Sequence, residues 1–286
     1  MQSVKTIRAV ERAFQVLEAL QRTPEGATLA QLQAETGLSG PTLLRLLKTL
    51  TGVKAVRRST ADQRYRPGMR LTILTRDMAP AERLADVAAP WIDELCEQLE
   101  WPSDLAVHMG NDDFVKVLES SLRQSRFYLR RRPGRVRINL LGSAAGMAFV
   151  SALPRDRRNE LVAAARAGRD IHNAKVIAAG DLEQHVASAR RRGYSLRHPL
   201  YRGGSFNGEP RDDALQAMAV PVIAHGRLLG ALNLNWNRAA ASEREMAKRS
   251  LPALQRAVAG IAEAAADAGL VELLPGLEDA EGFAGA

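Results

Sequence analysis

The segment from residue 28 to residue 66 constrains the fold of this chain more than any other. Two helices with apolar periodicity, expected over 28–35 and 39–50, are separated by Gly37-Leu38-Ser39, a tight turn in which glycine easily adopts a left-handed backbone. Thr28 and Ser39 are suited to cap the two helices, and Pro41 fits the first turn of the second one. The second helix would bury Leu43, Leu46, Leu47 and Leu50. Two short helices joined by such a turn are typical of a helix-turn-helix.

A basic hairpin is expected directly after these helices. Residues 56–59 and 63–66 have the pattern of two short strands around the turn Thr60-Ala61-Asp62, and they carry four arginines. A further helix is expected over about 4–21, because apolar side chains recur there every three or four residues. Its predicted buried stripe consists of Ile7, Val10, Phe14, Leu17 and Leu20. Together these elements predict a winged helix-turn-helix whose third helix enters the DNA major groove.

The residues predicted to contact DNA lie on the third helix, at the two helix starts and on the wing. They are Thr28, Ser39, Gly40, Pro41, Thr42, Leu44, Arg45, Lys48, Arg57, Arg58, Arg64 and Arg66. Arginine and lysine neutralise phosphates, whereas an apolar side chain reads a thymine methyl group. Leu44 is open to two interpretations, as a contact to such a methyl group or as a packing residue.

The distribution of charge agrees with a small DNA-binding domain. Residues 1–70 contain 12 Lys and Arg against 5 Asp and Glu, whereas the rest of the chain contains 28 against 27. A basic domain joined to a nearly neutral one is the electrostatic pattern of a nucleic-acid-binding protein with a second function. A merely soluble basic surface remains the alternative explanation for the charge alone.

The remaining sequence predicts a second domain of mixed structure. Strands are expected over 104–109, 114–119, 215–224 and 228–236, and helices over 81–99, 144–152, 155–165, 181–192 and 242–266. Pro90 predicts a kink or a division of the first of these helices. Strands, helices, strands and a closing helix indicate an antiparallel α+β domain. The expected organisation is a DNA-binding domain at 1–70, a linker at 71–82, a second domain at 83–268 and a disordered tail at 269–286.

Several classes of protein are disfavoured. No apolar run is long enough for a membrane helix, the N-terminus lacks a secretory signal, and the single Cys96 excludes an internal disulfide, so we expect a cytoplasmic protein without membrane contact. Cys96 is expected to be a buried structural thiol rather than a nucleophile. The chain has neither a G-x-S-x-G elbow nor a phosphate-binding glycine loop, so we expect no enzyme. The five histidines show no H-E-x-x-H or comparable ligand spacing, so no metal or cofactor is indicated, and a metal site assembled across the fold stays open as an alternative.

The segment from Gly37 to Leu50 resembles the recognition segment of IclR-type transcription regulators, and the Ile7-Arg8-Ala9-Val10 start and the wing also fit. Gly40, Pro41 and Leu44 depart from the usual residues of that family, so its operator sequences do not transfer. The second domain is similar to the GAF-like effector domain of the family. Three stretches resemble the branch that regulates 3-(3-hydroxyphenyl)propionate catabolism, namely 101–104, 119–123 and 251–256. The resemblance implies a homodimer or homotetramer that binds double-stranded DNA and a small-molecule effector, for which an aromatic carboxylate is expected.

Six residues are candidates for effector binding: Arg123, Ala144, Ala145, Asn207, Asn233 and Asn235. The two last asparagines share one face of an alternating strand, where they either line a cavity or meet solvent. The small residues of Ser143-Ala144-Ala145-Gly146 either let a carboxylate approach a helix N-terminus or allow close packing of helix on sheet. Asn207 lies in a glycine-rich loop that could cover a pocket.

Arg123 begins an arginine-rich segment that extends to residue 137, and three roles are open for it. It could belong to a solvated loop, contact another subunit, or clamp an effector carboxylate with its planar guanidinium.

The hypothesis from these observations is a ligand-controlled transcription regulator. Two alternatives remain, a sequence-indifferent basic DNA-binding protein and a GAF-like ligand sensor with an output other than transcription. The basic winged helix disfavours the sensor, and the polar strand face of the second domain favours control by a ligand.

Overall fold

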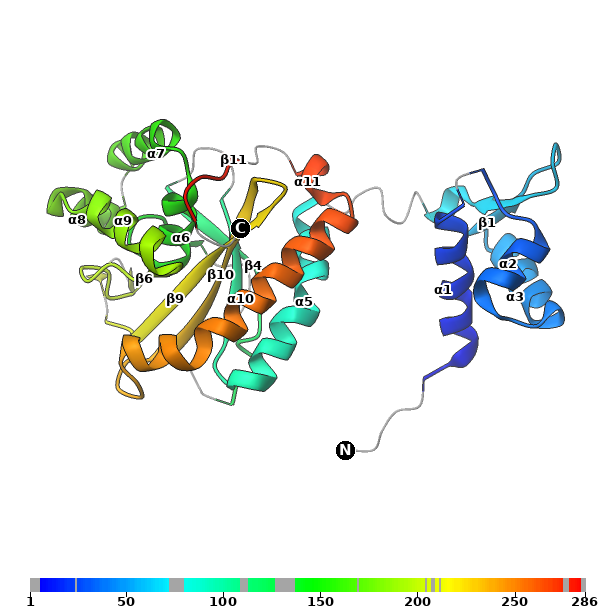
Figure 1. Cartoon of the computed structure of the whole chain (residues 1–286), viewed down its shortest axis with the longest axis horizontal. Coiled ribbons are helices and arrows are strands. Elements are labelled where there is room, and N and C mark those ends of the chain that lie inside the picture. Colours follow the sequence, from blue (N-terminus) through cyan, green and yellow to red (C-terminus); the bar gives the residue numbers. More distant parts are fainter. Residues whose placement is uncertain are drawn as a thin grey trace. The chain divides into compact units, whose positions relative to one another are not determined.

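The computed structural model describes residues 6–23, 25–71, 80–108, 113–126, 137–168, 170–203, 205–206, 209–210, 212–274 and 278–283. The chain divides into two compact units, Met1–Met78 and Ala79–Ala286, which are described one at a time. Figure 1 shows the elements of both units.

The first unit is a winged helix-turn-helix. Helices α1 (Arg8–Gln21), α2 (Leu29–Thr36) and α3 (Gly40–Gly52) are followed by strands β1 (Val56–Arg58) and β2 (Tyr65–Pro67), which pair antiparallel. Gly37 ends α2 with a φ of 65°, as the predicted turn requires. Thr28 caps α2, whereas the Ser39 hydroxyl donates to the Thr42 hydroxyl at 2.9 Å and makes no cap bond. The core of this unit includes Val16, Leu20, Leu32, Leu43, Leu47 and Tyr65.

Helix α1 buries only part of the stripe that the sequence predicted, namely Leu20 fully and Leu17 partly. Its buried residues are Val16, Ala19 and Leu20, and they lie in the second half of the helix. Ile7, Val10 and Phe14 are 70%, 51% and 59% exposed. The prediction failed because periodicity identifies an apolar face but not the partner that covers it, and the partner here contacts only part of α1.

The second unit is built on one antiparallel sheet with the strand order β5-β4-β3-β10-β9-β6, and β11 adds to the start of β10. Its long central pair is β9 (Leu215–Ala224) with β10 (Arg227–Asn237). The shorter strands are β3 (Ser103–Val107), β4 (Phe114–Ser120), β5 (Arg137–Asn139), β6 (Ser195–Leu196) and β11 (Glu278–Asp279). A separate small hairpin consists of β7 (Ser205–Phe206) and β8 (Glu209–Pro210).

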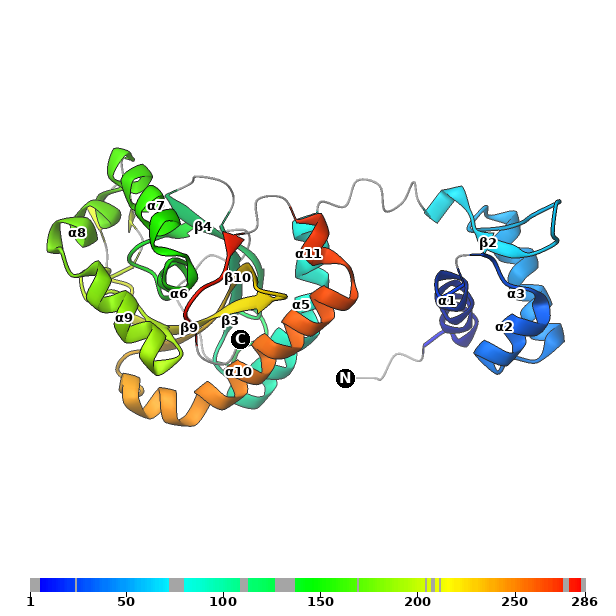
Figure 2. The same ribbon diagram turned by 45° about the horizontal axis from the view of Figure 1, so that its top comes forward.

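Helices cover both faces of this sheet, as Figures 1 and 2 show. Helices α5 (Pro80–Leu99) and α10 (Glu243–Asp267) pack together on one face. Helix α6 (Ala144–Ala152) packs on the other face and is accompanied by α7 (Arg155–Ala167), α8 (Ile171–Ala179) and α9 (Leu182–Arg192). Each face has its own apolar core: Leu232 and Leu234 of β10 face α10, whereas Leu228 and Ala231 face α6. The predicted α+β class with an antiparallel sheet is confirmed.

Two expectations about the second unit need correction. Helix α5 begins at Pro80, inside the predicted linker, and continues through Pro90 as one helix. The expected disordered tail contains a short helix α11 (Leu270–Leu273) and strand β11. Leu270 is fully buried, and the Glu281 N–H donates to the Ala152 carbonyl at 2.7 Å. These contacts are to residues distant in sequence, so local composition could not reveal them.

Cys96 is buried in α5 as predicted, and this burial raises the pKa of its thiol. Within the part of the chain that is described, no helix is long and apolar enough to cross a bilayer.

The start of α6 is held against the preceding loop with no room for a side chain at Gly146. A Cβ atom there would lie 2.0 Å from the Leu140 carbonyl oxygen, which is backbone and has little freedom to move. We expect Gly146→Ala to lower the free energy of unfolding by about 1–3 kcal/mol through overpacking. Gly52→Ala is the matched control, because nothing lies within 4 Å of a Cβ there, and a change within about 0.5 kcal/mol is expected. Chemical denaturation of both variants measures this difference, and equal stabilities would contradict the packing argument.

Candidate nucleic-acid interface and ligand sites

The outer face of α3 presents the residues expected for a recognition helix. Leu43, Leu47 and Leu50 are buried against the rest of the unit. Arg45 and Lys48 lie on the opposite side and are exposed, and Leu44 is 49% exposed. This exposure favours Leu44 as a surface for a partner over its alternative role in packing. Pro41 and Ser39 are also exposed, and Gly40 is half-buried beside the Gln33 side chain.

Thr28 was predicted to contact DNA, and in the structure it also caps helix α2. Its hydroxyl accepts the Gln31 N–H at 3.3 Å, while the Gln31 side-chain oxygen accepts the Thr28 N–H at 2.9 Å. This reciprocal capping box fixes the start of α2. Thr42 likewise uses its hydroxyl to accept from Ser39.

The four wing arginines divide into two pairs with different roles. Arg64 donates to the Gly26 carbonyl at 2.8 Å, and Arg66 donates to the Glu25 carbonyl at 2.7 Å. Arg66 also forms an ion pair with Asp62 at 2.6 Å, and this hydrogen bond holds the pKa of Asp62 well below its usual range. These two arginines therefore fasten the wing to the loop before α2.

The other two wing arginines point outward from β1. Arg58 is exposed, lies over the Tyr65 ring and donates to the Gln63 carbonyl at 3.1 Å. Arg57 is exposed, and its side chain has no ion-pair or hydrogen-bond partner in the described part of the chain. Together with Arg45 and Lys48, Arg57 gives the unit cations that are available to a phosphate backbone.

In the second unit, Asn233 and Asn235 belong to a buried hydrogen-bond network. The Asn233 side-chain oxygen accepts from the Asp104 N–H at 2.9 Å and from the Asn235 amide at 3.0 Å. The Asn235 amide also donates to the Asp104 carboxylate, and the Ser120 hydroxyl donates to that carboxylate at 2.7 Å. Both asparagines are 3% exposed, so their alternative role as solvent-facing residues is wrong.

This network lies on one row across the sheet. Strand pairing aligns Ser120 with Asp104, Asp104 with Asn233, Asn233 with Ala219, and Ala219 with Ser195. Directly opposed residues in an antiparallel sheet share a face, and Ala219 belongs to the core beneath α6. A polar row that includes the small residue Ala219 therefore runs under α6, and the Ser195 hydroxyl has no partner among the described residues.

The other effector candidates lie in different surroundings. Ala144 and Ala145 are fully buried at the start of α6, whose Ser143 cap accepts from the Gly146 N–H at 3.0 Å. The close approach of this turn to Leu140 makes packing sufficient to explain its small residues. Arg123 is exposed, so this structure does not bring it to the buried row. Asn207 and the arginines at 130–135 lie outside the described residues.

Two features of the second unit that involve histidines were not predicted from the sequence: the buried His172, and a cluster that contains His185 and His198. His172 of α8 is buried, its ring contacts the Tyr201 ring edge-on, and neither ring nitrogen has a partner in the described regions. Burial lowers the pKa of His172, so its neutral form is favoured.

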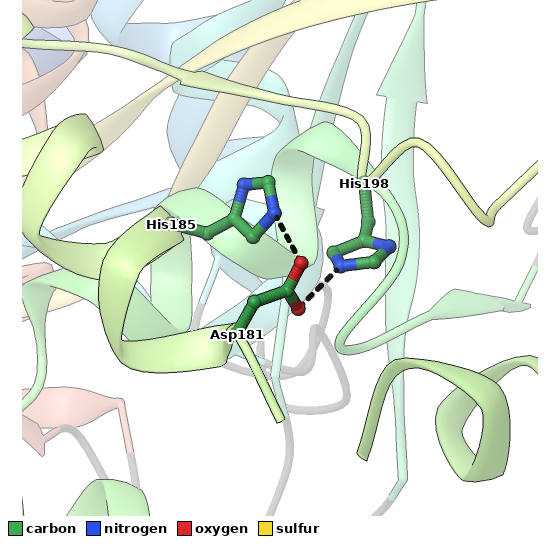
Figure 3. A group of neighbouring side chains, drawn as sticks. All are labelled: Asp181, His185 and His198. Carbon is green, nitrogen blue, oxygen red and sulfur yellow. Dashed lines mark hydrogen bonds and ion pairs between the residues drawn. The ribbon is translucent and has the colours of Figure 1, made fainter. Parts of the chain in front are cut away.

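The second group consists of Asp181, His185 and His198, which the fold brings together. Figure 3 shows both rings directed at the one carboxylate. The i, i+4 spacing of Asp181 and His185 at the start of an expected helix was a visible signal. His198 comes from a separate segment, so only the fold brings it to the other two.

The fold and the exposed basic face of α3 define a winged helix-turn-helix DNA-binding protein with a second, sheet-based domain. The sequence profile of the IclR helix-turn-helix domain matches residues 9–60. The HTH-type transcriptional regulator XynR of Escherichia coli K12 is 24% identical over 243 residues, which are 84% of this chain and 90% of XynR.

Solved structures have the same fold. An IclR homolog from Microbacterium sp. strain HM58-2 has 21% identity and a TM-score of 0.52, with 89% of this chain and 96% of that chain covered. An IclR family transcriptional regulator from Brucella abortus has 20% identity and a TM-score of 0.51, with 91% and 93% covered. The first unit therefore contains an IclR-type helix-turn-helix domain, and the whole chain shares the fold of these solved structures.

The two kinds of wing arginine lead to different expected effects of substitution. Arg57→Ala should lower DNA affinity and reduce the slope of log K against log salt by about one per bound chain, with unchanged thermal stability. Arg64→Ala should lower the melting temperature of the first unit, because the Gly26 carbonyl loses its partner. Fluorescence anisotropy over a salt series and thermal denaturation separate the two effects. A loss of stability in Arg57→Ala would show that this side chain also supports the wing.

Proposed function

We propose that this chain is a DNA-binding transcription regulator that acts in the cytoplasm and whose operator binding is controlled by a small-molecule effector. The observation that carries the proposal is the exposed basic face of α3 beside a wing with an outward-pointing arginine. In winged helix-turn-helix proteins such a helix reads base edges while the wing lies along phosphates. Arg45, Lys48 and Arg57 are proposed as phosphate contacts, and Leu44 as an apolar contact to a thymine methyl group.

A second copy of the chain is the proposed partner of α1. Ile7, Val10 and Phe14 follow one another at helical spacing and are all more than half exposed. An exposed apolar stripe of this kind is typical of a protein–protein contact. Pairing of two chains would place two α3 helices in successive major grooves of a pseudo-palindromic operator. The family resemblance supports a dimer or a tetramer.

The polar row beneath α6 is the proposed effector site. It combines hydrogen-bonding groups with the small side chain of Ala219, and Ser195 brings a hydroxyl without a described partner. The buried carboxylate of Asp104 lies in the row and accepts hydrogen bonds from the Ser120 hydroxyl and the Asn235 amide, so the row suits a hydrogen-bond donor of the effector better than a carboxylate, which only accepts. We therefore propose that a hydroxyl group of the effector faces the row and that its carboxylate points away from Asp104.

An aromatic carboxylate is the proposed effector class. Support comes from the resemblance of residues 101–104, which include Asp104 of the row, to the branch for 3-(3-hydroxyphenyl)propionate. A hydroxylated aromatic acid has both groups that the proposal requires, a hydroxyl group that faces the polar row and a carboxylate that points away from Asp104.

Operator binding tests the proposed function. We expect the DNA upstream of the gene for this chain to bind at least about 1000-fold more tightly than random DNA at physiological salt, since base contacts add to the phosphate contacts. Anisotropy titrations with both DNAs measure this ratio. They are repeated with 3-(3-hydroxyphenyl)propionate and with 3-phenylpropionate, and only the hydroxylated acid is expected to shift the operator curve. Equal affinity for both DNAs would favour a sequence-indifferent binder, and a response to neither acid would overturn the effector class.

The proposed dimer contact leads to a separate expectation. Phe14→Glu places a charge in the stripe and should convert a dimer into monomers, with a large loss of operator affinity because each half-site is then bound alone. Gln15→Glu, an exposed position on the same helix, is the matched control and should remain dimeric. Analytical ultracentrifugation gives the mass of each variant. An unchanged dimer in Phe14→Glu would exclude this stripe as the contact.

A further inference from the structure

The cluster of Asp181, His185 and His198 has the geometry of a metal site. The two carboxylate oxygens of Asp181 lie 3.0 Å from Nε2 of His198 and 3.3 Å from Nε2 of His185. One ligand atom from each residue lies within 4.8 Å of the other two. Nitrogen and oxygen ligands at about 2.0–2.2 Å from Zn²⁺ are separated from each other by roughly 3–3.5 Å. Figure 3 shows that the three side chains already converge, so we expect that small side-chain movements suffice to surround an ion.

Two fixed segments hold these ligands. Asp181 is the N-cap residue of α9, yet its side chain makes no cap hydrogen bond and turns to the imidazoles instead. His185 follows one helical turn later on the same side of α9. His198 lies after β6, where its backbone N–H donates to the Gly142 carbonyl at 2.9 Å, and its side chain is almost wholly buried. The ligand positions are thus set by the fold before any ion binds.

The ligand atoms of the cluster also suit a divalent cation, because two imidazole nitrogens and a carboxylate are common ligands of such ions. Glu183 does not compete as a ligand, because the Arg158 guanidinium holds both of its oxygens at 3.0 Å.

We propose that Asp181, His185 and His198 bind a divalent transition-metal ion of the Zn²⁺ class. Imidazole nitrogen with one carboxylate is a donor set for Zn²⁺, Co²⁺ or Ni²⁺, whereas Mg²⁺ and Ca²⁺ prefer oxygen alone. The side chains of Asp181 and His185 are about one-third exposed, so solvent reaches one side of the ion. Three protein ligands and an accessible position are typical of an ion that exchanges or accepts a further ligand, rather than of a closed structural site.

Metal binding has a local consequence for the turn that follows His198. The Leu200 N–H is 3.2 Å from Nδ1 of His198, so that nitrogen acts as an acceptor and Nε2 carries the ring proton. Coordination through Nε2 moves this proton to Nδ1, where it faces the Leu200 N–H. The turn must then shift, and it carries Tyr201, the residue whose ring contacts His172. The ion would thereby alter the environment of His172 without touching it.

The test uses untagged full-length protein that has been treated with a chelator and dialysed. Isothermal titration with Zn²⁺ should show one ion per chain with a Kd in the micromolar range or tighter, and Co²⁺ should give visible d–d absorption of a four- or five-coordinate site. His185→Gln and Asp181→Asn should each weaken binding at least about tenfold, because both side chains are partly exposed and leave the buried His198 in place.

His225→Asn is the matched control, since His225 is an exposed histidine in the turn between β9 and β10. Asparagine tolerates its left-handed backbone, and this variant should bind Zn²⁺ like the original chain. Circular dichroism confirms that each variant is folded. Only millimolar affinity for Zn²⁺ in the original chain, or equal affinity in His185→Gln and Asp181→Asn, would overturn the proposal.

Discussion

The second unit depends on the register of β10. This strand pairs with β9 along its whole length, with β3 on its other side and with β11 at its start. A shift by one residue would turn Leu232, Leu234 and Trp236 from the core beneath α10 to the face beneath α6. It would also separate Asn233 from the Asp104 N–H. Apolar packing on one face and polar pairing on the other therefore select the same alignment, and the hydrogen bonds of Asn233 depend on it.

The first unit illustrates how one residue type serves two purposes. Arg64 and Arg66 donate to carbonyls of residues 26 and 25 and so define the angle of the wing, whereas Arg57 extends from the neighbouring strand. The proposed contact of Arg57 with DNA phosphates thus depends on a wing geometry that Arg64 and Arg66 maintain. The formal charge of the unit overstates the number of cations that a phosphate backbone can reach, because an arginine bound to carbonyls and a carboxylate has fewer donors to offer.

Much of this architecture could be predicted from local patterns. Periodicity located α1, α2, α3, α10 and the central strands, since each has an apolar face that repeats within a few residues. Contacts over long sequence separations could not be predicted in this way. The partners of Arg64 and Arg66 are 38 and 41 residues away, and His198 is 17 residues from Asp181. The exposure of Ile7, Val10 and Phe14 on α1 could not be predicted either, because a sequence pattern shows which side chains are apolar but not which residues cover them.

Strand β11 has a consequence for solubility. Strand β3 pairs with β10 only from Ala231 to Leu234, so on this side the start of β10 would be a sheet edge with free backbone groups. Strand β11 pairs there with Arg227 and Leu228. Open edges of this kind are templates for intermolecular strand addition. The ion pairs of Arg157 with Glu278 and of Arg227 with Asp279 fasten the covering strand. A chain shortened before residue 278 would keep the buried residues of both apolar cores, but it would lose Ala280 and Phe283 from the rim of one core together with its protection against aggregation.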